Sequence, residues 1–395
     1  MRFILLIFLL AAVCAADKVF VIDTNGKLAE IDLETGTVNP EVAQLGKYPN
    51  DILYSGGYLY VINSGSDDKA LQKIDAATFE IRNLAIGTGY NCWAGLFVAE
   101  DTLVVSAALH NSLVAVATSS MSIVTEAEGI GPNPEWMCLG PECLFVACGG
   151  WGKDNNLVAC TYSSADTIEV GTNCQSVACD WEDGELFVVN SGVYGNDEGS
   201  VSVVDPATGT VTDTLFLGGF PSIICIRGNK AYIGDGWGAG VYVVDTKTHQ
   251  VLHSQSDPVF TGGTGFALDL SGNLYVSDSK AGQVRIYDEE DKLLATYSVS
   301  NPGALVVVET NGIEREGVVP VPGSLTLSPC PAVARVNVSG LEPFASVAFY
   351  EISGRCVGTA RADGEGEAVF SVSGLPRGVY TAVSGGTAAR FSVVR

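Results

Sequence analysis

The sequence predicts an all-β protein: a seven-bladed β-propeller followed by a small immunoglobulin-like β-sandwich. Three observations lead to this fold class. Apolar residues come in short alternating or continuous runs between clusters of Gly, Asn, Asp and Ser, which is typical of strands and turns. One run recurs seven times, about forty to forty-five residues apart. The charge and composition of the chain then change after residue 323.

The first sixteen residues are predicted to be a secretory signal peptide. A basic start and the apolar stretch Phe3–Leu10 precede small residues that end at Ala16. This stretch is shorter than the ~20 apolar residues that cross a bilayer, and no later stretch approaches that length, so no transmembrane segment is expected in the mature chain. Lipid attachment at Cys14 is the weaker alternative, because such signals prefer a very small residue where Val13 stands. We expect a protein that passes through the periplasm and is secreted or displayed on the outer-membrane cell surface.

The composition of the mature chain restricts its partners. Removal of the signal peptide takes away one of the eleven cysteines and one basic residue, so ten cysteines remain and the formal charge changes from −24 to −25. An exported protein meets an oxidising environment, where an even number of cysteines favours disulfides. The excess of acidic residues argues against nucleic acid or anionic membranes as partners, since both attract basic surfaces.

The recurring run is the strand that defines each repeat. It occurs as KVFVID at Lys18, YLYVINSG at Tyr58, TLVVSA at Thr102, CLFVACGG at Cys143, ELFVVNSG at Glu185, KAYIGDG at Lys230 and NLYVSDS at Asn273. A period of this length with several short strands per repeat is typical of a propeller blade.

A strand that ends in Asp follows most of these runs, and its carboxylate is expected to accept hydrogen bonds from the backbone of the next turn. These aspartates are Asp32, Asp75, Asp205, Asp245 and Asp288. Repeats three and four carry Ala117 and Thr161 instead, so their turns must differ.

A G-x-x-P loop then leads into another apolar strand, as at Gly46–Pro49, Gly131–Pro134 and Gly218–Pro221. Only the signal peptide precedes KVFVID, so the first blade lacks its innermost strand. We expect residues 303–309 to supply that strand after the seventh repeat, which would pair the two ends of the propeller and leave no open edge.

Residues 17–309 resemble the YVTN family of β-propellers, whose blades carry a "YVTN" strand, an "ID-x-x-T" turn and a "G-x-x-P" loop. The resemblance implies the fold and says little about activity. Such families include binding proteins, and similar propellers carry metal-dependent lactonases and lyases. Fold alone does not determine function.

A linker at residues 310–323 is followed by a second module, residues 324–395, which holds six Arg and five Asp or Glu. Its five to seven short predicted strands suit a small sandwich. It resembles the type A C-terminal sorting domain of the type IX secretion system through SPCPA at Ser328, FYEISGRCV at Phe349 and GLPRGVY at Gly374. The resemblance implies outer-membrane translocation by the type IX machinery, with either release or attachment. An ordinary appended β-domain is the alternative.

The cysteines are expected to be structural. Cys330 and Cys356 are disulfide candidates because a second module this small buries little core. Six further cysteines lie between Cys138 and Cys179, with Cys92 and Cys225 outside this range. A zinc site is not favoured, since there is no C-x-x-C motif and no His pair. We expect disulfides that brace repeats three to five, with the pairing left open.

Candidate binding residues gather at one end of the propeller. The loops that enter the innermost strands share that end with the loops between the second and third strands of each blade. The first set of loops carries Asn50, Trp93, Trp136 and Gln175, and the second carries Trp151, Tyr194 and Trp237. Exposed aromatic residues mark contact surfaces, so we expect binding of a glycan or a surface protein there. For Trp93 and Trp136, the alternative is that they plug the central channel.

Catalysis has less support in the sequence. There is no nucleophile elbow, no metalloprotease helix and no phosphate loop. Asp51 and Glu135, with Asn50 and Gln175, are the only set that would suit a metal-assisted hydrolase, lactonase or lyase at the channel mouth. No cofactor is expected. Acidic loops such as GSDDK at Gly65 suit calcium by ligand type, but none has a full calcium-loop spacing, so solvated turns are the preferred interpretation.

Overall fold

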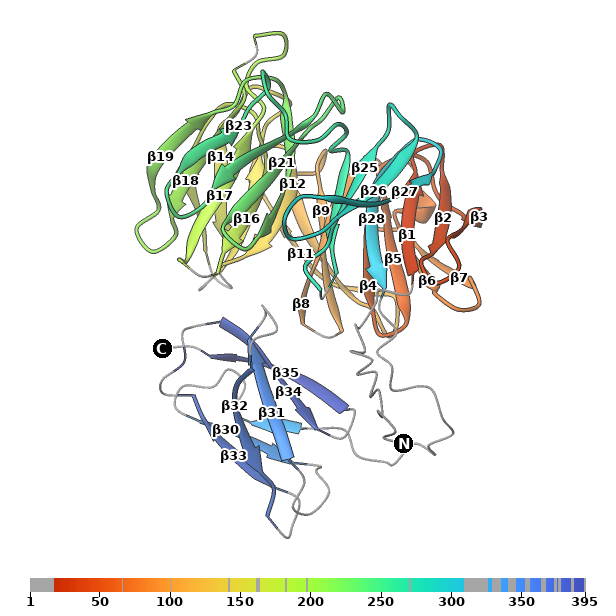
Figure 1. Ribbon diagram of the computed structural model, residues 1–395, viewed down its shortest axis with the longest axis vertical. Coiled ribbons are helices and arrows are strands. Elements are labelled where there is room, and N and C mark those ends of the chain that lie inside the picture. The colour runs from red at the N-terminus through yellow and green to blue at the C-terminus, as the bar shows by residue number, and fades with distance from the viewer. Residues whose placement is uncertain are drawn as a thin grey trace, which may run out of the picture. The chain divides into compact units, whose positions relative to one another are not determined.

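The structure is a computed structural model (Figure 1). It describes residues 18–308 apart from 66, 100, 141–142, 161–163, 182, 197 and 270, and the stretches 326–328, 335–339, 346–351, 356–363, 367–372, 375, 378–384 and 387–393. The predicted signal peptide and linker lie outside these residues. The chain divides between Glu309 and Thr310 into two compact units, which are described separately.

The first unit is a seven-bladed β-propeller, and each blade is a four-stranded antiparallel sheet. From the innermost to the outermost strand, blade one holds β28 (Pro302–Val308), β1 (Lys18–Asp23), β2 (Lys27–Asp32) and β3 (Thr37–Gln44). Blade two holds β4 (Pro49–Ser55), β5 (Tyr58–Asn63), β6 (Leu71–Asp75) and β7 (Ile81–Leu84). Blade three holds β8 (Cys92–Ala99), β9 (Thr102–Ala107), β10 (Ser112–Ala117) and β11 (Ser122–Glu128).

The remaining blades follow the same order. Blade four holds β12 (Pro134–Leu139), β13 (Leu144–Cys148), β14 (Asn156–Cys160) and β15 (Ala165–Glu169), and blade five holds β16 (Cys174–Asp180), β17 (Glu185–Asn190), β18 (Ser200–Asp205) and β19 (Thr210–Phe216). Blade six holds β20 (Pro221–Arg227), β21 (Lys230–Asp235), β22 (Val241–Asp245) and β23 (Gln250–His253), and blade seven holds β24 (Gly265–Leu268), β25 (Leu274–Asp278), β26 (Gln283–Tyr287) and β27 (Leu293–Ser298).

The predicted repeat is confirmed, because each recurring run forms the second strand of a blade. The predicted closure is also confirmed. Strand β28 pairs antiparallel with β1, with Lys18 opposite Val308 and Val21 opposite Leu305, and Figure 1 shows the two strands side by side. The first blade is therefore built from both ends of the propeller sequence, so neither end leaves an unpaired innermost strand.

The turn aspartates have the predicted structural role. Asp32 accepts hydrogen bonds from the backbone N–H of Thr35 at 2.7 Å and from its hydroxyl at 2.8 Å, and these bonds lower the pKa of the Asp32 carboxyl. Asp75 and Asp245 accept equivalent backbone bonds from Thr78 and Thr248, both at 2.8 Å. The turns are thus held by local hydrogen bonds that recur with the repeat.

The core lies between neighbouring blades. Phe20 of blade one packs with Leu59 and Val61 of blade two, and Phe187 of blade five packs with Ile233 of blade six. Alternate residues of each strand face the two neighbouring blades, so the middle strands are apolar on both sides. Among the described residues, no helix is long and apolar enough to span a membrane; a short 3-10 helix, η1 (Asp67–Lys69), follows β5.

The predicted disulfides of repeats three to five are not formed in this structure. The propeller cysteines are thiols that pack as small apolar groups: Cys174 and Cys179 belong to one buried cluster and Cys148 to another. Burial raises the pKa of the Cys92 thiol to about 12. Geometry in these blades therefore supports an apolar packing role for the cysteines.

The described part of the second unit forms two small sheets. One has the order β29 (Thr326–Ser328), β30 (Arg335–Ser339) and β33 (Ala368–Ser371), and the other has the order β32 (Cys356–Arg361), β31 (Ser346–Glu351), β34 (Gly378–Ser384) and β35 (Thr387–Val393). Side chains from both sheets share one apolar cluster, in which the rings of Phe349 and Phe370 stack at 3.9 Å. Cys330 and the side chain of Cys356 lie outside the described residues.

Candidate functional site

Three aromatic rings from blades five and six form one cluster at one end of the propeller. The ring centroids of Tyr194 and Phe220 lie 6.0 Å apart, those of Tyr194 and Trp237 6.1 Å, and those of Phe220 and Trp237 6.2 Å. Tyr194 is 75% exposed and Trp237 is 60% exposed. We refer to Tyr194, Phe220 and Trp237 as the aromatic cluster. Large exposed rings held against each other form a preorganised apolar contact surface.

The buried carboxylate of Asp235 holds two of these rings in place. Its Oδ1 accepts the backbone N–H of Trp237 at 2.9 Å, and its Oδ2 accepts the backbone N–H of Phe220 at 3.0 Å and the hydroxyl of Tyr242, also at 3.0 Å. Asp235 ends β21, so the same residue fixes the loop before β20 and the loop after β21. The relative positions of the two rings are therefore determined by one side chain.

The loop before β20 depends on glycine. Gly219 has a φ of +63°, and a Cβ there would lie 2.4 Å from the hydroxyl oxygen of Tyr242. A side chain at this position would displace the bond between Tyr242 and Asp235. Gly219 thus preserves the contacts of Asp235 that position the backbone of Phe220.

Trp151, another predicted binding residue, stands apart from this cluster. It is 57% exposed and has a φ of +59°, and no aromatic ring among the described residues contacts it. Its loop lies between β13 and β14 of blade four, on the same end of the strands as the aromatic cluster. The predicted aromatic end therefore contains one three-ring cluster and one separate exposed ring, while Trp93 and Trp136 are half-buried in β8 and β12.

Four predicted site residues occupy equivalent places in the innermost strands. They are the second residues of β4, β8, β12 and β16, namely Asn50, Trp93, Glu135 and Gln175. The β-ladder of each strand shifts register at this point, so an irregular backbone presents these side chains. Consecutive innermost strands contact each other around the propeller axis. We refer to these four residues as the inner arc.

The inner arc contains buried polar atoms that lack partners. Among the described residues, Asn50 Nδ2, Trp93 Nε1 and Glu135 Oε2 have no hydrogen-bond partner, and the same holds for the nearby Asn133 Oδ1 and Ser176 Oγ. An unmatched buried group costs about 1–3 kcal/mol. Buried polar groups in folded proteins are nearly always paired with protein atoms or with ordered water.

Glu135 is the central carboxyl of this region. It is only 4% exposed, and its Oε1 accepts a hydrogen bond from the side chain of Asn133. Burial raises its pKa to about 8, although hydrogen bonds from Asn133 and Gln175 act in the opposite direction. The group is therefore mainly protonated at neutral pH and is able to donate a hydrogen bond.

Asp51 occupies a different environment from Glu135. Its Oδ2 accepts the backbone N–H of Gly95 at 2.9 Å and its Oδ1 that of Ile52 at 2.8 Å, while burial raises its pKa to about 6. It thus links β4 to the next blade. Because Asp51 and Glu135 lie two blades apart with separate partners, the geometry does not favour them as an acid and base pair.

The acidic loops also have local hydrogen-bonding roles. Asp67 accepts the backbone N–H of Gly89 at 2.9 Å, and Asn155 donates to Glu169 at 3.0 Å. Within the described part of the chain, no three His, Cys, Asp or Glu side chains gather in a way that could hold a metal ion.

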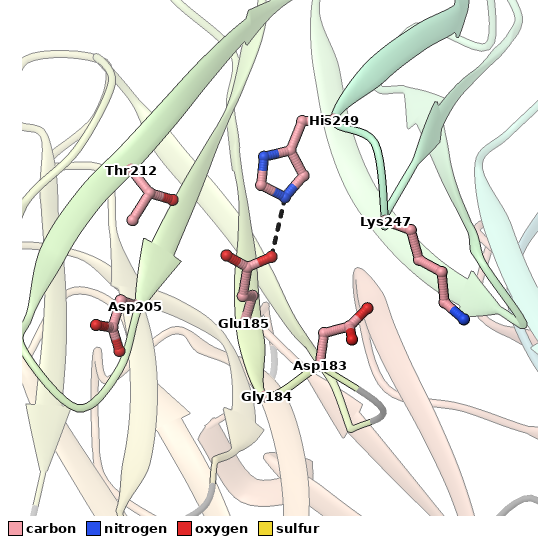
Figure 2. A pocket seen from close by; sticks show the side chains of 7 residues that line it. All are labelled: Asp183, Gly184, Glu185, Asp205, Thr212, Lys247 and His249. Carbon is pink, nitrogen blue, oxygen red and sulfur yellow. Dashed lines mark hydrogen bonds and ion pairs between the residues drawn. The ribbon is translucent and has the colours of Figure 1, made fainter.

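A polar pocket that the sequence did not predict lies at the end of the strands opposite the aromatic cluster. This hollow of about 640 Å³ lies between blades five and six and is lined by Asp183, Gly184, Glu185, Asp205, Thr212, Lys247 and His249. Figure 2 shows His249 pointing to Glu185, and the His249 Nε2 lies 2.9 Å from Glu185 Oε2. His249 has a φ of +53°, where other repeats have Gly36 and Gly209. Histidine in place of glycine at this turn position is the sequence feature that could have indicated the pocket.

The fold and site define a β-propeller with an exposed aromatic cluster at one end. No protein-family model and no curated protein matches this sequence. Among solved structures, the chain is similar to a putative 6-phosphogluconolactonase from Bacteroides fragilis, with a TM-score of 0.56 and 16% identity over 74% of this chain and 98% of that one. A putative 6-phosphogluconolactonase from Bacteroides uniformis has the same TM-score, with 14% identity over 74% and 99%.

A third similar structure is the hydrazine synthase of Kuenenia stuttgartiensis. Its TM-score is 0.52, with 18% identity over 65% of this chain and 89% of that chain. At these identities the likenesses establish the propeller fold alone, and they carry no argument about activity.

Proposed function

We propose that this protein is an exported propeller that binds a glycan or a surface protein through the end that carries the aromatic cluster. The observation that supports this function is the preorganised contact of Tyr194, Phe220 and Trp237, two of whose rings are largely exposed. Rings on fixed loops offer apolar area at little entropic cost, and they stack against sugar faces and side chains. Trp151 adds a second contact on the same end.

The electrostatics of the chain suit this role. A formal charge of −24 keeps the protein soluble and repels anionic surfaces, so recognition depends on apolar and hydrogen-bonding contacts rather than on bulk attraction to anionic partners. The lactonase names of the similar structures offer a metal-assisted or hydrolytic alternative, but no observation on the described residues favours it.

A double substitution tests the aromatic cluster. Tyr194→Ala with Trp237→Ala, and Trp151→Ala separately, should each weaken binding in a glycan array or in a pull-down of surface proteins. A tenfold loss for the double variant corresponds to about 1.4 kcal/mol. Phe216→Ala is the matched control, since this ring is 73% exposed but lies on the outermost strand β19.

Binding in the glycan array indicates a glycan ligand, and binding in the pull-down indicates a protein ligand. If Phe216→Ala weakens binding as much as the double variant, or if the double variant binds as the native protein does, the aromatic cluster is not the binding surface. Thermal unfolding of each variant shows whether the propeller remains folded.

We further propose that residues 324–395 form an immunoglobulin-like sorting domain that directs the propeller through the type IX secretion system to the cell surface or the medium. The resemblance of its three sequence blocks supports this proposal. Deletion of residues 324–395 should retain the propeller inside the envelope, as followed by fractionation and immunoblotting. Normal delivery of the truncated chain would refute the sorting role.

A further inference from the structure

We propose that the aromatic cluster of Tyr194, Phe220 and Trp237 recognises a quaternary ammonium group, as carried by a small organic cation of the choline class. The inference rests on the proposed function, because the same rings are its contact surface, and it names the chemical group that they bind. Two of the rings are largely exposed and all three lie next to one another, so one ligand group can contact the whole cluster.

The centroids of the three rings form a nearly equilateral triangle. Their separations are 6.0, 6.1 and 6.2 Å, and Tyr194 and Trp237 are 75% and 60% exposed. A point about 3.5 Å above the plane of this triangle lies about 5 Å from each centroid, which is within the ~6 Å range of a cation–π contact. A trimethylammonium group at that point would contact all three rings.

The three rings do not form a flat platform. The plane of Tyr194 is inclined by 78° to that of Phe220 and by 64° to that of Trp237, and the planes of Phe220 and Trp237 differ by 44°. A flat ligand stacks on one ring at a time, whereas a rounded group touches rings that are turned in different directions. The negative charge of an aromatic quadrupole lies on the ring face, so a rounded group with positive charge suits this arrangement.

The loops around the rings offer few hydrogen-bonding side chains. Besides Phe220 and Trp237, residues 217–221 and 236–240 contain only Leu, Gly, Pro and Ala. Asp235 is buried, and each of its oxygen atoms already accepts two hydrogen bonds from the protein. Primary ammonium and guanidinium groups carry several N–H donors that need acceptors. A quaternary ammonium group carries none, so these loops favour it over the other two cations.

The charges near the cluster also favour a cation. The chain has a formal charge of −24, Asp235 lies directly behind the backbone of two of the rings, and Glu198 is exposed on the loop that carries Tyr194. Lys280 is a basic residue beside the Trp237 loop, with its Cγ 3.9 Å from the position of a Cβ on Gly238. Its side chain is exposed, so water and salt screen its charge.

The test compares three probes that separate charge from shape. They are choline, its neutral analogue in which carbon replaces the charged nitrogen, and ethanolamine, which has a primary ammonium group. The readout is the indole N–H signal of Trp237 in the ¹H–¹⁵N spectrum of the full mature chain, assigned by its loss in Trp237→Phe. We expect choline to shift this signal saturably and to bind at least about tenfold more tightly than either of the other probes.

The spectrum contains its own control. Trp151 is 57% exposed at the same end of the propeller but lies outside the aromatic cluster, so its indole signal should stay in place during the choline titration. Sodium chloride at the same concentrations should leave both indole signals unchanged, which excludes an effect of ionic strength.

A matched pair of variants separates the ring face from apolar area. Tyr194→Phe keeps an aromatic face and should bind choline within about twofold of the native protein, whereas Tyr194→Leu should weaken choline binding at least about fivefold. Binding of the neutral analogue should be the same in both variants. Phe216→Ala, on the outermost strand β19, should bind choline as the native protein does. The remaining indole signals report whether each variant is folded.

Three results would overturn the proposal. They are binding of the neutral analogue or of ethanolamine as tightly as choline, equal choline binding by Tyr194→Phe and Tyr194→Leu, and no saturable shift of the Trp237 signal with choline.

The outcome for the proposed function is read separately. If choline fails to bind while Tyr194→Ala with Trp237→Ala weakens binding in the glycan array or the pull-down, the ligand class is wrong and the contact surface stands. If choline binds saturably while the double variant leaves array and pull-down binding unchanged, the site for the cation stands and the proposed function fails.

Discussion

The carboxylate of Asp235 accepts the backbone N–H of Trp237 at 2.9 Å. Its second oxygen accepts the backbone N–H of Phe220 at 3.0 Å, so one buried group joins the two loops that carry rings of the aromatic cluster. The aromatic cluster therefore has a supporting residue that does not itself belong to it. The exposed rings and the residue that holds their loops can therefore be substituted separately.

Asp235→Asn should weaken both the fold and ligand binding. An amide nitrogen in place of one oxygen would face a backbone N–H or the Tyr242 hydroxyl, and a bond to a buried charged acceptor would be lost at a cost of about 1–3 kcal/mol. Urea unfolding measures the first effect and the binding assay the second. Asp257→Asn is the control, because this side chain is 79% exposed, and an equal effect there would contradict the supporting role.

Glu135 should make stability depend on pH. Its folded-state pKa is raised from 4.5 to about 8, so the folded protein binds more protons than the unfolded chain between these values. The free energy of unfolding should therefore fall as pH rises from 4.5 to 8, by at most about 1.4 kcal/mol per pH unit from this group. Glu135→Gln should flatten the profile in urea unfolding at pH 5 to 9. A parallel profile for the two proteins would show that Glu135 is not the cause.

Arg227 and Asp291 should form a strong clamp between blades six and seven. The Arg227 guanidinium bonds to Asp291 and donates to the carbonyl oxygen of Asp288 at 2.7 Å, and both charged side chains are largely buried. Asp291→Ala leaves Arg227 without its carboxylate partner, so we expect a loss of about 3 kcal/mol in the free energy of unfolding. Glu41→Ala, which removes the exposed partner of Lys27, should cost less than about 1 kcal/mol. Similar losses in denaturant titrations of both variants would argue against the clamp.

His249 should be conformationally strained in its turn. Its φ of +53° falls where blades one and five have glycine. The ring points to Glu185 (Figure 2), with Nε2 at 2.9 Å from that carboxylate, and its Nδ1 lies 3.7 Å from Asp213. Both His249→Ala and His249→Gly lose these contacts, but only glycine relieves the backbone. His249→Gly should therefore be more stable than His249→Ala by about 1 kcal/mol in urea unfolding. Equal stability of the two variants would show that the strain is absent.

Much of the propeller fold was predictable because its strands and turns are specified by short stretches of neighbouring residues. The seven recurring strands, the Asp32 type of turn and the closing strand, predicted at residues 303–309 and found at Pro302–Val308, all follow from runs of a few residues that repeat at one period. The disulfides predicted for repeats three to five are not present among the described residues. Cysteine count and compartment predicted pairing, whereas Cys148 and Cys174 pack as apolar thiols in the structure.

The sequence predicted which candidate residues lie at one end of the propeller, but not which of them contact each other. The phase of the repeat placed Tyr194, Trp151 and Trp237 at one end, yet it did not separate Trp151 from the other two. It also nominated Asp51 and Glu135 together, although they lie in blades two and four with different partners. The pocket at His249 went unnoticed, since its lining comes from turns of two blades.

By itself, the sequence determined the number of blades, the order of strands and the way that the ring closes, because strand period and turn hydrogen bonds are encoded in neighbouring residues. Only the tertiary structure decided that Phe220 joins Tyr194 and Trp237, that Asp235 supports them, and that the inner arc holds buried atoms without partners. These relationships are distances between loops of different blades. They depend on how the blades pack around the axis, which no short stretch of sequence specifies.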